Sequence, residues 1–247
     1  MKRTLLFVLG LIAAGCAEPI PRNLDNLSMQ GPQYLDPETL EPYSGPAYRR
    51  SEDDSTQIVL RVNLRDGRFH GDFEDREPEG FFGGIYETGT YRDGQREGRF
   101  ENFYPGGVFK GRGTYENGLK EGPDESYYEN GQISSRGTYR DGQRDGPSEN
   151  YNENGQLFSK WSYKDGERHG PSVSYHSDGR LWATMNYNEG RLQGPFERYG
   201  DNGQLYHKGT YLGVGPERGL PSQCGESFLS GRTRTYPPCP PGLEDGN

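Results

Sequence analysis

Residues 137–157 read Gly-Thr-Tyr-Arg-Asp-Gly-Gln-Arg-Asp-Gly-Pro-Ser-Glu-Asn-Tyr-Asn-Glu-Asn-Gly-Gln-Leu, and variants of this stretch recur along most of the chain. The most regular column is a tyrosine that returns every 24 residues, at Tyr91, Tyr115, Tyr139, Tyr163, Tyr187 and Tyr211. A fixed period between about 20 and 50 residues is typical of a solenoid, in which each repeat stacks on its neighbours. The sequence therefore predicts an extended repeat protein.

Each repeat has the pattern of a β-hairpin. Asn154-Gly155 lies between two short alternating runs, and Asn-Gly in that position favours a two-residue turn with positive φ at both residues. Because side chains alternate across a strand, Leu157, Trp161 and Tyr163 are expected on one face. An Asp-Gly-x-x-x-Gly connector joins successive hairpins. We predict an all-β fold, a single elongated antiparallel sheet of stacked hairpins.

The chain divides into four segments. Residues 1–15 resemble a secretory signal, with Lys2 and Arg3 before a short apolar run. Residues 16–44, rich in Pro, Asn, Asp and Glu, are predicted to form a disordered tether. Residues 45–221 hold about seven hairpins, with irregular copies at both ends that cap the sheet. Residues 222–247 form a Pro-rich tail.

The signal ends in Ala13-Ala14-Gly15-Cys16, which resembles the bacterial lipobox. That resemblance implies that Cys16 is diacylated and becomes the N-terminus after cleavage. An ordinary signal peptide cut near Gly15 is the alternative. We therefore expect a protein anchored by lipid in the cell envelope, at the outer membrane and facing the periplasm if the host is Gram-negative.

Cys224 and Cys239 are the other two of the three cysteines. In an oxidising compartment such a pair suggests a disulfide. A metal or redox pair is the weaker alternative, because neither CxxC spacing nor a nearby histidine is present. The net charge of −9 argues against binding to nucleic acid or directly to anionic lipid headgroups.

No catalytic grouping is recognisable. The four histidines, His70, His169, His176 and His207, are scattered over regular repeat positions, so no catalytic residue, metal site or cofactor is predicted. The candidate interaction face is a column of glutamates beside a column of tyrosines: Glu101, Glu125, Glu149 and Glu197, with Tyr127, Tyr151, Tyr175 and Tyr199. Alternatively, the glutamates form a solvated ladder balanced by Arg112, Arg136, Lys160 and Lys208. Val173 interrupts the column.

The consensus of residues 137–157 resembles the bacterial MORN-repeat variant, over roughly residues 45–211. That resemblance implies a sheet of stacked hairpins without catalytic residues, used for protein or membrane-associated interaction, and many such bacterial proteins are classed as antitoxin-like. Three functions stay open: a scaffold that binds another envelope or secreted protein, an antitoxin or immunity factor, and a cell-wall glycan binder that recognises peptidoglycan.

Overall fold

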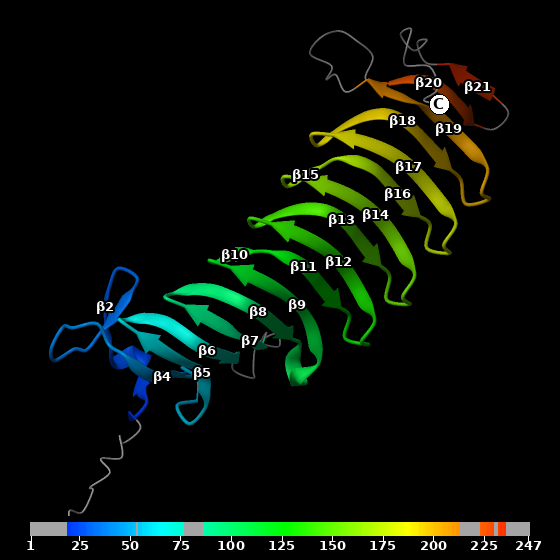
Figure 1. Cartoon of the computed structure of the whole chain (residues 1–247). Helices are drawn as coiled ribbons and strands as arrows, with labels where there is room; N and C mark the ends of the chain where they lie inside the picture. The colour runs from blue at the N-terminus through cyan, green and yellow to red at the C-terminus, as the bar shows by residue number, and fades with distance from the viewer. Residues whose placement is uncertain (1–18, 53, 77–85, 213–222, 230–231, 236–247) are drawn as a thin grey trace, which may run out of the picture.

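The protein is an elongated stack of curved hairpins, shown in Figure 1. The computed structural model describes residues 19–52, 54–76, 86–212, 223–229 and 232–235. Nineteen strands in these ranges belong to one sheet, and two more form a small sheet of their own. The prediction of one long sheet of stacked hairpins is confirmed.

The N-terminal part contains β1 (Arg22–Asn23), the 3-10 helix η1 (Leu24–Asn26), β2 (Ser28–Gln30), β3 (Gln33–Leu35), β4 (Gly45–Arg50), β5 (Ile58–Arg65), β6 (Arg68–Arg76) and β7 (Tyr86–Arg92). The middle part contains β8 (Gln95–Phe103), η2 (Pro105–Gly107), β9 (Phe109–Glu116), β10 (Leu119–Lys120), β11 (Gly122–Tyr127), β12 (Ile133–Arg140), β13 (Gln143–Tyr151) and β14 (Leu157–Lys164). The last part contains β15 (Glu167–Arg168), β16 (Gly170–Tyr175), β17 (Leu181–Asn188), β18 (Arg191–Tyr199), β19 (Leu205–Leu212), β20 (Gln223–Leu229) and β21 (Arg232–Thr235).

Two turn types alternate along the stack, and the two-residue turn predicted at Asn-Gly is wrong. Asp141 and Gly142 of a connector both have positive φ, 49° and 79°, which is the signature of the two-residue hairpin turn. At Asn154-Gly155 only the glycine has positive φ, and its N–H donates to the carbonyl of Asn152 at 2.8 Å. The N–H of Asn152 donates to the carbonyl of Gln156 at 2.8 Å, so the turn has three residues, 153–155. The Asn154 side chain accepts the N–H of Gln156 within it.

A β-bulge beside each three-residue turn changes the predicted faces. In β13 and β14 the register shifts so that Tyr151 lies opposite Leu157. Facing residues project from the same side of a sheet, and the Tyr151 hydroxyl reaches Glu149. Leu157 therefore lies on the face of Glu149, and its predicted grouping with Trp161 and Tyr163 is wrong, because the bulge adds one residue to the alternation.

The opposite face of the sheet, here called the core face, buries the largest side chains. Phe100 and Phe196 are each 1% exposed there, and the tyrosines of the 24-residue column pack around them. The rings of Tyr91 and Phe100 lie 5.7 Å apart, and those of Tyr211 and Phe196 lie 4.5 Å apart. The tyrosine period is therefore a packing seam between repeats.

The N-terminal segment caps this core. Leu24, Leu27 and Leu35 are at most 8% exposed, and Leu24 and Leu27 join a cluster with Val62 and Phe73. Strand β1 also pairs with β4 in parallel and covers that edge of the sheet. The prediction of a disordered tether over residues 16–44 is thus wrong for residues 19–44. Three isolated leucines among polar residues show no period, yet the open end of a repeat stack supplies an apolar surface for them.

The C-terminal end also continues further than predicted. Strand β20 pairs with β19, and β21 pairs with β20, so a further hairpin follows the point where the array was expected to end. Cys224 lies in β20, whereas Cys239 lies outside the described residues, as do Cys16 and the rest of the signal. None of the described helices is long and apolar enough to span a membrane.

Candidate interaction face

Residues that face one another form a continuous line across the sheet, on the side opposite the core face. We call this side the ladder face. In chain order the line contains Tyr48, Arg61, Glu74, Thr88, Glu101, Arg112, Glu125, Arg136, Glu149, Lys160, Val173, Thr184, Glu197 and Lys208. From Glu101 to Lys160 the charges alternate in sign. All four glutamates predicted from the sequence lie in this one line.

Glu149 shows how the ladder is held together. Its Oε2 accepts hydrogen bonds from the Tyr151 hydroxyl at 2.6 Å and from Arg136 Nε at 2.6 Å, and its Oε1 lies 3.1 Å from Lys160 Nζ. Although the residue is only 9% exposed, these donors, the tyrosine hydroxyl first, lower the pKa of Glu149 to about 2. The carboxylate is therefore bound within the protein.

The same arrangement recurs along the line. Glu125 accepts from Arg112 Nε at 2.8 Å and from the Tyr127 hydroxyl at 3.1 Å. Glu197 accepts from the Tyr199 hydroxyl at 2.5 Å and faces Lys208 in the register. The hydroxyls of Tyr127, Tyr151 and Tyr199 thus donate to the glutamates. These contacts fit the balanced ladder, the alternative that the sequence left open.

The ladder lacks charge at one step between Glu101 and Lys208. There Val173 faces Thr184, and Tyr175 of the candidate column has no glutamate two residues before it. Two aromatic side chains are exposed beside this step on the same face: Phe158, 47% exposed, lies two residues before Lys160, and Trp182, 41% exposed, lies two residues before Thr184. Sequence reasoning noted the Val173 break but missed both aromatics.

At the N-terminal end the ladder face is hollowed. A cavity of about 770 Å³ lies over β4 to β7, lined by Tyr48, Arg61, Glu74 and Thr88 of the ladder and by Pro21 and Pro46 among others. The sequence contained no signal for it, because the lining comes from the cap and from irregular repeats. In the part of the chain that the structure describes, no group of three or more His, Cys, Asp or Glu could hold a metal ion.

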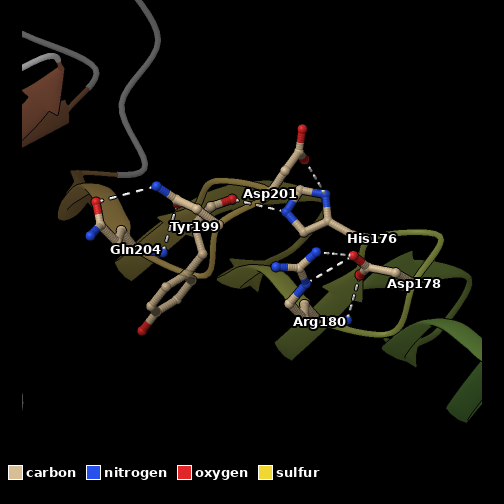
Figure 2. A network of polar contacts seen from close by, with 7 residues as sticks. His176, Asp178, Arg180, Tyr199, Asp201 and Gln204 are labelled. Atoms are coloured by element: carbon tan, nitrogen blue, oxygen red, sulfur yellow. Dashed lines mark hydrogen bonds and ion pairs between the residues drawn. The ribbon is translucent and has the colours of Figure 1, made fainter.

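The outer turns are linked from repeat to repeat. The Tyr128 hydroxyl donates to the carbonyl of Tyr151 at 2.7 Å, and one period before it the Tyr104 hydroxyl donates to that of Tyr127. His176 occupies the same column: Nε2 lies 3.0 Å from the Tyr199 carbonyl and Nδ1 lies 3.1 Å from Asp201 (Figure 2). This histidine replaces a tyrosine in the stack, and its contacts are structural.

These features define a non-globular β-repeat protein with one balanced charged face. Three of its segments, residues 120–141, 144–165 and 192–212, match the MORN repeat variant, a kind of repeat generally involved in protein or membrane binding and generally non-catalytic. Curated proteins yielded no match. Among solved structures, a GtfA/B complex bound to UDP and GlcNAc is 18% identical over 54% of this chain and 25% of that chain, with a TM-score of 0.20, too low to carry an argument.

Proposed function

We propose that this protein is a lipid-anchored, non-catalytic scaffold of the cell envelope that binds another envelope or secreted protein through the ladder face. The MORN repeat variant matches support an interaction role. The observation that carries the proposal is the uncharged step at Val173 and Thr184, where Phe158 and Trp182 are exposed on an otherwise self-paired surface. Exposed aromatic side chains are enriched among residues that dominate protein interfaces.

A photo-crosslinking amino acid at position 158 or 182 tests the binding surface in cells that express the full chain. Both positions are expected to capture the same protein reproducibly. Position 119 is the matched control, because Leu119 is 50% exposed but lies away from the uncharged step. No product at 158 and 182, or the same product at 119, would contradict the proposal.

A double variant tests whether binding depends on the uncharged step itself and not on the stability of the sheet. Replacing Val173 by Glu and Thr184 by Arg continues the alternation from Lys160 to Glu197. Val173 and Thr184 are half-buried, and the two new charges would face each other as a pair. The sheet is therefore expected to keep its stability within about 1 kcal/mol. Binding is expected to fall at least tenfold, since the partner would then meet paired charges in place of the uncharged step.

The proposed lipid anchor is attached to Cys16, and it rests on the lipobox-like sequence of residues 13–16. With Cys16→Ser, incorporation of labelled palmitate and recovery in the membrane fraction are expected to be lost, while the repeat region stays folded. For a Gram-negative host, separation of inner and outer membranes shows whether the protein lies in the outer one. Continued labelling of the serine variant would contradict this part of the proposal.

The exposed aromatics also suit a cell-wall glycan, because sugar rings stack on Trp and Phe side chains. Phe158 and Trp182 occupy equivalent positions of neighbouring repeats, which would suit a repeating polymer. Retention of the protein on purified peptidoglycan at moderate salt, lost with Trp182→Ala, would favour this second function. If purified peptidoglycan does not retain the protein, the glycan-binding function is excluded and the protein-binding scaffold remains the proposed function.

A further inference from the structure

Pairs of a tyrosine and a cation recur from repeat to repeat on the core face. Four cations recur every 24 residues, and each faces a tyrosine of the main column. The pairs are Tyr91 with Arg96, Tyr115 with Lys120, Tyr139 with Arg144, and Tyr163 with Arg168. We call these residues the cation–tyrosine row. The cations stack on aromatic rings: Arg96 lies 4.7 Å from the Phe100 centroid and Arg144 lies 5.4 Å from that of Tyr163.

The two halves of the row differ in charge balance. Arg96 is paired with Glu87 at 2.7 Å, and Lys120 is paired with Asp124. Arg144 and Arg168, by contrast, lie within ion-pairing distance of no carboxylate among the described residues. Arg144 donates to the Tyr139 hydroxyl and to Ser148 Oγ, both uncharged. In an acidic protein, two cations without a carboxylate partner, one repeat apart on the same face, form a local positive site.

Arg168 is the more strongly organised of the two. Its guanidinium carbon lies 3.8 Å from the centroid of the Trp161 ring and 5.4 Å from that of Tyr187. The indole is itself held, because Trp161 Nε1 donates to Ser159 Oγ at 2.8 Å and Ser159 is only 3% exposed. In the described part of the chain no hydrogen bond uses a guanidinium N–H of Arg168. A stacked guanidinium with unused N–H groups at its edge is preorganised for a carboxylate.

We propose that Arg168, together with Arg144, binds carboxylates of an acidic polypeptide segment that lies along the long axis of the sheet. The guanidinium groups cover the ring faces of Trp161 and Tyr163, so the site offers N–H donors rather than a stacking platform for sugars. The two arginines are two strand spacings apart, about 10 Å. An extended polyproline-type segment repeats its side chains every three residues, about 9 Å, so acidic residues at that interval match both arginines.

This inference names the chemistry of a partner for the proposed scaffold, but it uses the face opposite the uncharged step. The two claims can therefore fail separately. Crosslinks from positions 158 and 182 test the ladder face, whereas direct binding of a defined acidic peptide tests the cation–tyrosine row.

The experiment measures binding of a fluorescent (Glu-Pro-Pro)₆ peptide to the full-length protein by anisotropy, with (Gln-Pro-Pro)₆ as the uncharged control. The acidic peptide is expected to bind at least tenfold more tightly. Arg168→Gln is expected to weaken binding at least tenfold, and Arg168→Lys to recover only part of it, because lysine keeps the charge but loses the planar stack. Arg96→Gln is the matched control and is expected to change binding less than twofold, since Arg96 already has its carboxylate.

Equal binding of both peptides, or unchanged binding by Arg168→Gln with native circular dichroism, would overturn the proposal. If Arg168→Gln fails to fold, Arg144→Gln and Arg168→Lys keep the test decisive: a folded variant of either kind with unchanged affinity overturns it. Binding to polygalacturonate or to vesicles of phosphatidylcholine and phosphatidylglycerol, without binding to the acidic peptide, would also overturn it.

Discussion

The ring of Phe100 lies directly against the backbone of Gly89, on the neighbouring strand of the core face. A Cβ built on Gly89 would meet three ring atoms of Phe100 at 2.6 Å. Because the ring is only 1% exposed, it has no open space to move into. This contact explains why the glycine of the Gly-Thr-Tyr motif is needed in this repeat: it leaves room for the aromatic side chain of the next strand.

Gly89→Ala is therefore expected to destabilise the N-terminal repeats by about 1–3 kcal/mol, because the added methyl group overpacks a filled site. The change is measured as a shift in the midpoint of urea or thermal unfolding. In a Phe100→Ala background the ring is gone, so the further cost of Gly89→Ala is expected to be small.

The matched control is Gly137→Ala, the same motif position two repeats later. There the nearest atom to a Cβ is Ser148 Oγ at 3.5 Å, an ordinary contact distance. This substitution is expected to be neutral, or stabilising by about 0.5 kcal/mol through the unfolded state. Equal losses at both glycines would show that the Phe100 contact is not the cause.

Leu24→Ala tests the N-terminal cap. Leu24 is 2% exposed, so its truncation is expected to cost about 2–5 kcal/mol in the free energy of unfolding. Ile20→Ala, at a side chain that is 85% exposed, is expected to change it by less than about 0.5 kcal/mol. If Leu24→Ala left the free energy of unfolding unchanged, the cap would contribute no stability, and the result would favour the disordered tether that the sequence predicted.

The stability of the ladder is expected to depend on pH through Glu149. Its folded pKa of about 2 lies below the ordinary value of 4.5, so its contribution is complete above pH 4.5 and is lost as pH falls towards 2. Glu149→Gln is expected to cost on the order of 2 kcal/mol at pH 7, and the difference from wild type should shrink between pH 4.5 and 2. Glu129→Gln, in an exposed turn, serves as control, and a pH-independent difference would refute this role for the Glu149 carboxylate.

Tyr128→Phe removes one link between neighbouring turns. Since its hydroxyl donates to the Tyr151 carbonyl at 2.7 Å, the loss is expected to be about 0.5–1.5 kcal/mol, with faster amide hydrogen exchange in residues 152–156. Tyr187→Phe is the control, because the Tyr187 hydroxyl makes no hydrogen bond within the described residues. Identical exchange in the two variants would argue against a turn-to-turn link.

Much of the candidate face could be predicted from spacing alone. Glu149 and Tyr151 are two residues apart in a strand, so their shared face follows from alternation, and the structure places them in direct contact. Leu157 could not be assigned in this way, because a bulge changes the alternation and its position depends on how two strands pair. The cavity beside Pro21 depends on the cap, which shows no periodicity.

The sequence by itself determined the repeat, the hairpins and the single sheet, because turn residues and a 24-residue period are local properties of the chain. Only the tertiary structure decided which residues face each other across strands. Register and burial depend on segments that are distant in sequence. For that reason the pairing of Glu149 with Arg136 and Lys160, and the burial of Leu24 on the first hairpins, emerged only from the assembled sheet.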